Sequence, residues 1–354
     1  MLKKKWLQVF LSIVMLLSLT SCLIADAVAA DNNDKKRPTQ FISIASAESG
    51  SFQYMYMAAY AGFLRNYMPH INLTTEATSG TSENLDLLFR NEVGIALSSP
   101  ERLYSAYHGL DSYKDRGKLN GGILWCYMQQ SALLATRKDS GIKGFADLAG
   151  KKVCIGSAGS SNEIKNAFIL DAYGYTRKAP GSFEFNELEA FSISYNEGAN
   201  ALSEGVVDAI VATRPLPDPA IYELALVRPV DIFPLDEDKF QVLRDIYPWM
   251  WEGAVPAGVY PGQEALLTLG DPNYVVASLD EVSEEDAYNM TKTYVEKILP
   301  QLAEQFAPVQ PYAADLSLLT SNWVIPGHPG AVRYFKEIGQ DITVATPSKE
   351  SDSQ

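Results

Sequence analysis

Cysteine and histidine are scarce in this chain, whose 354 residues contain three of each. His70, His108 and His328 lie far apart, and none has a neighbouring His or Cys at the short spacing of a zinc site. The sequence contains no Gly-x-Ser-x-Gly elbow and no phosphate-binding P-loop. It therefore predicts no metal site, no cofactor and no catalytic residues.

Positive charge is also in short supply, because 29 Lys and Arg face 43 Asp and Glu, which gives a formal charge of -14. This balance argues against binding to nucleic acid or to an anionic lipid surface. Residues 1–21 hold three lysines and no acid, so the rest of the chain carries -17. An anionic ligand remains compatible with this charge, since hydroxyls, backbone N–H groups and one arginine can neutralise it locally.

The long apolar run of the chain lies at its N-terminus. Three lysines at 3–5 precede apolar residues 6–19, a stretch too short to be interpreted first as a spanning helix. The following Leu19-Thr20-Ser21-Cys22 resembles the lipobox of bacterial lipoproteins, in which the cysteine receives the lipid. Ordinary signal-peptide cleavage at Ala27-Val28-Ala29 is the alternative. Both interpretations predict a periplasmic protein, either anchored to the membrane through Cys22 or soluble.

The body of the chain repeats one order of elements twice. Each set comprises strand, small-residue loop, helix, strand, helix and strand. The first set is expected at 41–45, 52–67, 71–77, 83–90 and 93–97, and the second at 152–156, 162–173, 191–195, 197–204 and 207–212. This alternation is typical of parallel βαβ units and predicts an α/β fold with two lobes.

The later segments are expected to return to the first lobe: strands at 265–269 and 274–278, one long helix over 283–305 and a last helix at 331–338. The predicted organisation is a signal peptide (1–21), a polar flexible tether (22–39), lobe 1 (40–137 plus 261–340), lobe 2 (138–260) and a polar tail (341–354).

Loops rich in Ser, Thr and Gly follow the strands at matching places in both halves. In parallel α/β sheets ligands bind at the carboxyl ends of strands, where helix N-termini present free N–H groups to anions. The candidate ligand-binding residues are Ser51, Phe52, Tyr54, Ser79, Thr81, Asn84, Ser98, Ser157, Gly159, Ser160, Ser161, Arg214 and Tyr260.

These candidates have structural alternatives. The serines and threonines are also suited to capping helices, and Asn84 to bracing a loop. Arg214 could pair with a substrate carboxylate or lie exposed on a loop, and the aromatic residues could wall a pocket or pack in the core. Cys126 and Cys154 could form a disulfide, but each lies in an apolar run that favours a small buried thiol.

Several separated stretches between residues 40 and 339 resemble the TAXI-type solute-binding proteins of tripartite ATP-independent periplasmic (TRAP) transporters. The resemblance is carried by the stretches at 78–85, 141–153, 156–161, 202–209, 255–260 and 328–337. It implies a type II-like periplasmic-binding-protein fold, with two lobes joined by hinge strands and a ligand cleft between them. It also implies closure on a small organic solute, expected here to be a carboxylate or an amino acid, and delivery to TRAP membrane subunits.

Two loops depart from the pattern of that family, at 48–54 and 158–161, so the resemblance does not name the solute. A sensory lipoprotein that reports ligand occupancy to a histidine kinase is the main rival interpretation. An enzyme on the same fold ranks below both, because no nucleophile and base constellation is visible.

Replacement of Cys22 by Ser tests the lipobox. The variant is expected to leave the membrane fraction for the soluble fraction, because the serine hydroxyl does not take the place of the thiol in lipid attachment. Immunoblots of fractionated cells, with Cys126→Ser as the matched control, give the measurement. Continued membrane retention of the Cys22→Ser protein would contradict the prediction.

Overall fold

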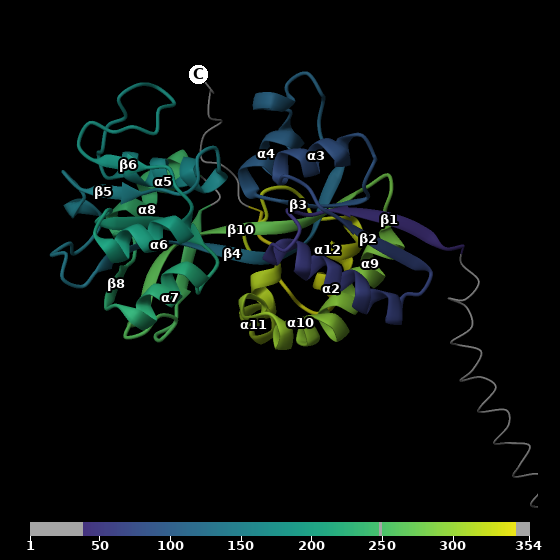
Figure 1. Cartoon of the computed structure of the whole chain (residues 1–354). Coiled ribbons are helices and arrows are strands. Elements are labelled where there is room, and N and C mark those ends of the chain that lie inside the picture. Colours follow the sequence, from purple (N-terminus) through teal and green to yellow (C-terminus); the bar gives the residue numbers. More distant parts are fainter. Residues whose placement is uncertain (1–37, 248–249, 345–354) are drawn as a thin grey trace, which may run out of the picture.

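The computed structural model describes residues 38–247 and 250–344, which fold into two α/β lobes side by side (Figure 1). Cys22, the alternative cleavage site and most of the predicted tether and tail lie outside the described residues. Within the described ranges no helix is both long and apolar enough to cross a membrane. The two-lobed arrangement is that of the periplasmic-binding-protein fold, as expected.

Lobe 1 is built on a sheet with the strand order β2-β1-β3-β10-β4. The central strand β1 is parallel to β2 and β3, whereas β10 is antiparallel to β3. All four residues of β3 are buried, as a strand covered on both faces requires. The strands of this part are β1 (Gln40–Ala45), β2 (Ile71–Glu76) and β3 (Ile95–Ser98).

Lobe 2 repeats that order with a second set of strands. Its first strand, β5 (Lys152–Cys154), lies between β6 (Glu189–Phe191) and β7 (Ala209–Arg214) and is parallel to both. The antiparallel strand beside β7 is β4, so β6-β5-β7-β4 corresponds to β2-β1-β3-β10. Two further strands, β8 (Val230–Phe233) and β9 (Trp251–Val255), pair with β4 and β10.

Strands β4 (Gly121–Arg137) and β10 (Leu266–Ser278) run through both lobes and pair antiparallel with each other between them (Figure 1). Their register shifts between Asn273 and Tyr274, where the partners change from Met128 to Cys126 and leave Tyr127 as an extra residue. Such a bulge re-aims the side chain of the inserted residue. The two segments expected at 265–269 and 274–278 are thus one continuous strand that contains Pro272.

The helices cover the sheets of both lobes (Figure 1). Those of lobe 1 are α2 (Phe52–Tyr67), α3 (Thr81–Phe89), α4 (Pro100–His108), α9 (Glu284–Thr293), α10 (Leu299–Gln305), α11 (Gln310–Ala314) and α12 (Pro329–Glu337). Those of lobe 2 are α5 (Ser161–Ala172), α6 (Tyr195–Glu204), α7 (Pro219–Val227) and α8 (Phe240–Ile246).

The helix expected over 283–305 is confirmed as one uninterrupted run of helical residues from Glu284 to Gln305. It contains a π-helical turn at Tyr294–Ile298 between α9 and α10, just before Pro300, which lacks the N–H of a regular helix. The strand expected at 191–195 ends at Phe191, because Ser194 begins α6 through a capping box with Glu197.

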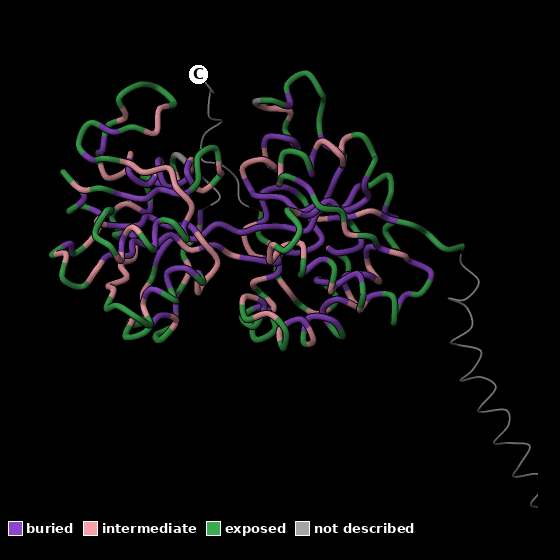
Figure 2. Tube along the Cα trace, viewed as in Figure 1, coloured by how far each residue is buried: buried purple, intermediate pink, exposed green. Residues whose placement is uncertain are grey.

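Lobe 1 has one buried core and lobe 2 has two, and no core spans both lobes among the described residues (Figure 2). The core of lobe 1 combines residues from 42–128 with residues from 274–335, whereas the two cores of lobe 2 lie between residues 132 and 269. Trp125 and Tyr294 stack at the centre of the first core with ring centroids 4.1 Å apart. Cys126 and Cys154 are buried free thiols, which confirms the favoured interpretation.

The contact of α12 with α9 depends on Gly330. A Cβ at this position would overlap the carbonyl oxygen of Glu284 and lie 2.5 Å from the amide nitrogen of Tyr288, both backbone atoms. Gly330→Ala is therefore expected to lower the free energy of unfolding by about 2 kcal/mol or more. Gly62→Ala, in the middle of α2 with no atom within 4 Å of the added Cβ, should raise it by about 0.5–1 kcal/mol. Thermal or chemical denaturation measures both, and equal behaviour of the two variants would contradict the packing argument.

Candidate functional site

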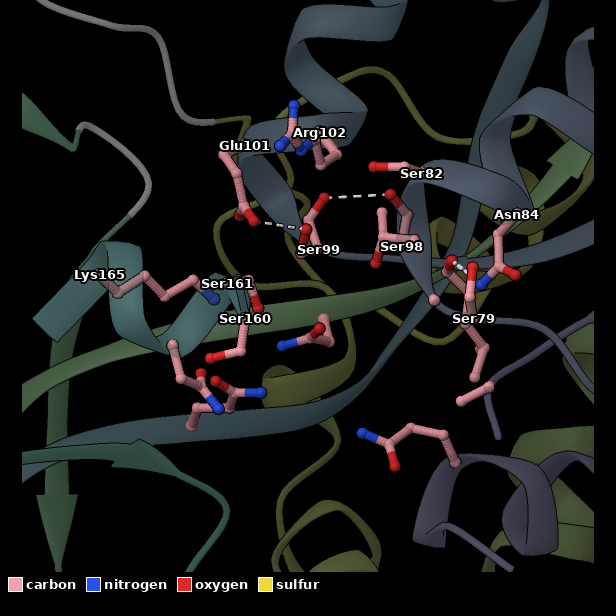
Figure 3. Close-up of a pocket in the computed structure, with 18 of the residues that line it drawn as sticks. Ser79, Ser82, Asn84, Ser98, Ser99, Glu101, Arg102, Ser160, Ser161 and Lys165 are labelled. Atoms are coloured by element: carbon pink, nitrogen blue, oxygen red, sulfur yellow. Dashed lines mark hydrogen bonds between the residues drawn. The ribbon is translucent and has the colours of Figure 1, made fainter. Parts of the chain in front are cut away.

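A cavity of about 480 Å³ lies between the lobes (Figure 3). Lobe 1 contributes the loops after β1, β2 and β3, lobe 2 contributes the start of α5 and the end of β7, and the crossing strands β4 and β10 contribute three side chains. The lining residues are Ser46, Ala47, Gln53, Ser79, Gly80, Thr81, Ser82, Asn84, Leu97, Ser98, Ser99, Glu101, Arg102, Tyr127, Gln130, Gly159, Ser160, Ser161, Asn162, Ile164, Lys165, Arg214 and Asn273.

Three helices begin at this cavity, namely α3, α4 and α5 (Figure 3). The α3 N-cap is Gly80, which has no side chain to accept a bond from the first turn. The α4 N-cap is Ser99, whose Oγ donates to Glu101 Oε1 at 2.7 Å and does not cap the helix. Two helix starts thus keep first-turn N–H groups without a side-chain cap, an arrangement that favours anions.

Asn84 of α3 ties together the ends of two strands below the cavity. Its Nδ2 donates to the carbonyl oxygens of Ser46, just after β1, and Leu97, in β3, at 2.7 and 2.8 Å. Thr78 Oγ1 donates to its Oδ1 at 2.6 Å. The amide group of Asn84 is therefore fully engaged by the protein, and its role is to brace the loops.

Asn166 of α5 makes the equivalent contacts in lobe 2. Its Nδ2 donates to the carbonyl oxygens of Ile155, just after β5, and Val211, in β7, at 3.0 and 2.9 Å. Thr213 Oγ1 donates to its Oδ1 at 2.9 Å. The two lobes thus hold their strand ends in place with the same device, although Asn166 does not line the cavity.

Carboxylates on the first turns of α3 and α5 hold the loops that precede them. Glu83 Oε2 accepts from the backbone N and the Oγ of Ser79, both at 2.7 Å, and these bonds lower the pKa of Glu83. Glu163 Oε2 accepts from the backbone N of Gly159 at 2.6 Å. Both loops are therefore shaped before any ligand arrives.

Three cationic side chains line the cavity. Arg214 Nε donates to Asp218 Oδ2 at 3.0 Å, and its guanidinium lies 5.2 Å from the centre of the Tyr195 ring. Lys165 is paired with Asp271 of β10, and both side chains are almost fully buried. Arg102 is half-buried on α4 and makes no ion pair within residues 38–247 and 250–344. Of the three cations in the lining, Arg102 is thus the one without an ion-pair partner in the described part of the chain.

Acceptor oxygens without a donor also line the cavity. In the part of the chain that the structure describes, Glu101 Oε2, Gln130 Oε1 and Asn162 Oδ1 are buried and have no hydrogen-bond partner. Burial raises the pKa of the Asp271 carboxyl to about 6, because loss of hydration outweighs the attraction of Lys165. Buried polar atoms without hydrogen-bond partners destabilise a folded protein. The three acceptors Glu101 Oε2, Gln130 Oε1 and Asn162 Oδ1 are therefore suited to donors on a ligand.

Eight of the thirteen residues predicted from the sequence line the cavity: Ser79, Thr81, Asn84, Ser98, Gly159, Ser160, Ser161 and Arg214. The other five do not. Ser51 caps α2, Ser157 is exposed on its loop, and Tyr54 lies on the first turn of α2 outside the lining.

The aromatic predictions Phe52 and Tyr260 lie away from the cavity. Phe52 packs edge-on against Phe306 in lobe 1, with ring centroids 5.7 Å apart. Tyr260 is fully buried in lobe 2, and its Oη accepts from the backbone N of Asp218 at 2.9 Å. Both side chains are packing residues, which was the structural alternative.

Sequence reasoning missed several lining residues. Glu101 and Arg102 belong to α4, which the elements expected from the sequence did not include, although it begins with Pro100, a helix-start signal. Its counterpart in lobe 2 is α7, which follows β7 and begins with Pro219. Lys165 lies one helical turn after Ser161, so helical spacing could have placed it on the same face. Tyr127, Gln130 and Asn273 belong to the crossing strands, and the bulge that aims Tyr127 leaves no mark in the sequence.

Residues 44–339 match the model of the NMT1-like family. The chain belongs to the NMT1-like family. Solved structures to which this NMT1-like protein is similar include the periplasmic aliphatic sulphonate binding protein SsuA from Escherichia coli, at 13% identity and a TM-score of 0.44, over 88% of this chain and 82% of that one.

A YaeC-family lipoprotein from Enterococcus faecalis matches this NMT1-like protein at 14% identity and a TM-score of 0.43, over 75% of this chain and 96% of that one. A putative L-cystine ABC transporter protein from Listeria monocytogenes matches at 14% identity and a TM-score of 0.39, over 75% and 95% of the two chains.

The paired asparagines can be tested together. Asn84→Ala and Asn166→Ala are each expected to lower the free energy of unfolding by about 2–4 kcal/mol, because each leaves two buried carbonyl oxygens without their donor. Thermal denaturation measures the loss, with Asn196→Ala, an exposed position in the first turn of α6, as the control. If Asn84→Ala weakened only solute binding and left stability unchanged, the bracing role would be wrong.

Proposed function

We propose that this NMT1-like protein is an extracytoplasmic solute receptor whose two lobes close on a small organic carboxylate or amino acid. The observation that carries the proposal is the cavity between the lobes, which is lined from both sides by loops at the carboxyl ends of parallel strands. Hinge closure around a ligand is the usual way in which such a cavity is used.

The preference for a carboxylate rests on the unpaired Arg102 and on the helix starts at Gly80 and Ser99. A planar guanidinium can bind both oxygens of a carboxylate, and uncapped first-turn N–H groups add donors to the same anion. The serine and threonine hydroxyls around them serve as further donors. The part of the cavity around Arg102 and these helix starts is thus suited to an anion, although the protein as a whole is acidic.

The preference for an amino acid among carboxylates rests on the unpartnered acceptors. Glu101 Oε2, Gln130 Oε1 and Asn162 Oδ1 have no donor among the described residues, and an ammonium group of the ligand would supply up to three. Glu101 is the charged member of this set and the natural partner of such a group. A ligand with a carboxylate at one end and an ammonium at the other satisfies both sides of the cavity.

Delivery of the solute to the membrane subunits of a TRAP-type secondary transporter is the finer part of the proposal. It is supported by the stretches that resemble TAXI-type receptors, among them 78–85 and 156–161, whose loops line the cavity. Membrane anchoring through a lipid on Cys22 belongs to the same proposal, as it would keep the receptor near those subunits.

A thermal-shift screen of carboxylates, amino acids and neutral solutes on residues 38–354 tests the function. A ligand that binds only the folded state raises the melting temperature, by an amount that grows with its concentration relative to Kd. We expect shifts with amino acids or carboxylates and none with neutral solutes. A screen in which no anion shifts the melting temperature would overturn the carboxylate assignment.

Substitution of Arg102 by Ala sharpens the screen. The variant is expected to bind the best ligand about 10- to 100-fold more weakly, since it loses charged hydrogen bonds. Arg90→Ala is the matched control, because Arg90 lies in the same lobe, is exposed and is paired with Glu92. Glu101→Gln should weaken the binding of amino acids far more than the binding of dicarboxylates. An equal loss of affinity for both would contradict the assignment of Glu101 to the ligand's ammonium group. Isothermal titration measures all three variants.

A further inference from the structure

A second cleft lies between the lobes on the other side of the crossing strands. It has a volume of about 350 Å³ and is formed by β4, by the loop after β7, by β9 and its following loop, and by the segments around α11 of lobe 1. We call it the back cleft, and its lining residues are Gln129, Ser131, Pro215, Leu216, Glu252, Gly253, Ala254, Val255, Pro256, Val259, Pro308, Pro311, Tyr312 and Leu318.

Strand β4 separates the two clefts. Gln130 lines the cavity described above, which we call the front cavity, whereas its neighbours Gln129 and Ser131 line the back cleft. The alternation of side chains along a strand requires this division. Arg214, the last residue of β7, lines the front, and Pro215, the first residue after it, lines the back. In Figure 1 the starts of α4 and α5 lie on one side of β4 and β10, and α11 lies on the other.

The chemistry of the back cleft differs from that of the front cavity. Four prolines, Leu216, Val255, Val259 and Leu318 make its lining mainly apolar. Glu252 is the charged residue of this lining, and it is paired with Arg244. Tyr312 is 2% exposed, and its hydroxyl is buried beside the Cys126 thiol of the lobe 1 core. The back cleft therefore suits a small neutral ligand with a mainly apolar surface.

We propose that the back cleft binds a small neutral molecule of this kind, and that its occupancy raises the affinity of the front cavity for the transported solute. The inference about coupling rests on the function proposed above, whereas binding in the back cleft stands on its own lining.

The coupling follows from the position of the hinge between the clefts. A rotation of the lobes about β4 and β10 that narrows the front cavity widens the back cleft, and the reverse rotation compresses it. A molecule held in the back cleft opposes its compression and so favours the state in which the front is narrow. By linkage, the front solute must raise the affinity of the back cleft by the same factor.

Filling the back cleft from the protein side tests the coupling. Ala254→Trp is expected to strengthen solute binding about fivefold or more, as measured by isothermal titration. Ala254 is exposed on β9, so the larger side chain can be accommodated without unfolding the core. Gly253→Leu is the second variant, because no atom lies within 4 Å of its added Cβ. Ala179→Trp, an exposed position of lobe 2 outside both linings, is the control.

Acetophenone, a small neutral molecule with an aromatic ring, tests binding directly. Its titration is expected to produce saturable shifts of the methyl resonances of Leu216 and Leu318, and these shifts should be abolished in Ala254→Trp. Shifts that do not saturate, or that survive in Ala254→Trp, would overturn the site. Unchanged solute affinity in both folded cleft-filling variants would overturn the coupling.

Failure of this inference is distinguishable from failure of the proposed function. The acetophenone titration needs no solute, so it reports on the back cleft even if the solute screen finds nothing. In that event, small-angle scattering of Ala254→Trp replaces the affinity measurement. A radius of gyration that differs from wild type, with the Ala179→Trp control unchanged, supports the coupling between cleft and hinge, and equal radii refute it.

Discussion

The antiparallel pairing of β4 with β10 is the interaction on which both lobes and both clefts depend. In lobe 1, β10 of this pair lies antiparallel beside β3, and in lobe 2, β4 lies antiparallel beside β7. The same pair supplies Tyr127, Gln130 and Asn273 to the front cavity and Gln129 and Ser131 to the back cleft. A change in the pairing would therefore alter the hinge and two ligand-sized spaces at once.

The charge of the cavity is independent of the charge of the protein. The chain is acidic overall, yet two helix starts and Arg102 give the front cavity its positive side. This is possible because Asn84, Glu83 and Glu163 complete the hydrogen bonding of the loops within the protein. The hydroxyl groups and N–H groups that point into the cavity are thereby kept available, and the net charge describes the outer surface.

Sequence reasoning found the loops of the site and missed much of its floor. The loops after β2 and before α5 could be predicted because parallel strands end at one edge of a sheet, which places Ser79 and Ser160 at the same opening. Arg102 was missed because the expected pattern stopped at the third strand and so left out α4, as it left out α7 after β7. Tyr127 was missed because a bulge shifts the alternation of side chains by one. Phe52 and Tyr260 were misplaced since an aromatic residue near a loop carries no sign of whether it faces a cavity or a core.

The antiparallel strand of lobe 1, β10, comes late in the sequence, and this position affects how the chain folds. A chain that emerges from the ribosome or a translocation channel does so with its N-terminus first, and β3 then has an edge that only β10, far along the sequence, can cover. Until β10 arrives, that edge is a template for pairing with other chains. Lobe 1 is therefore synthesised first but completed only when β10 is available. Until then a chaperone that covers the edge of β3 would prevent pairing with other chains.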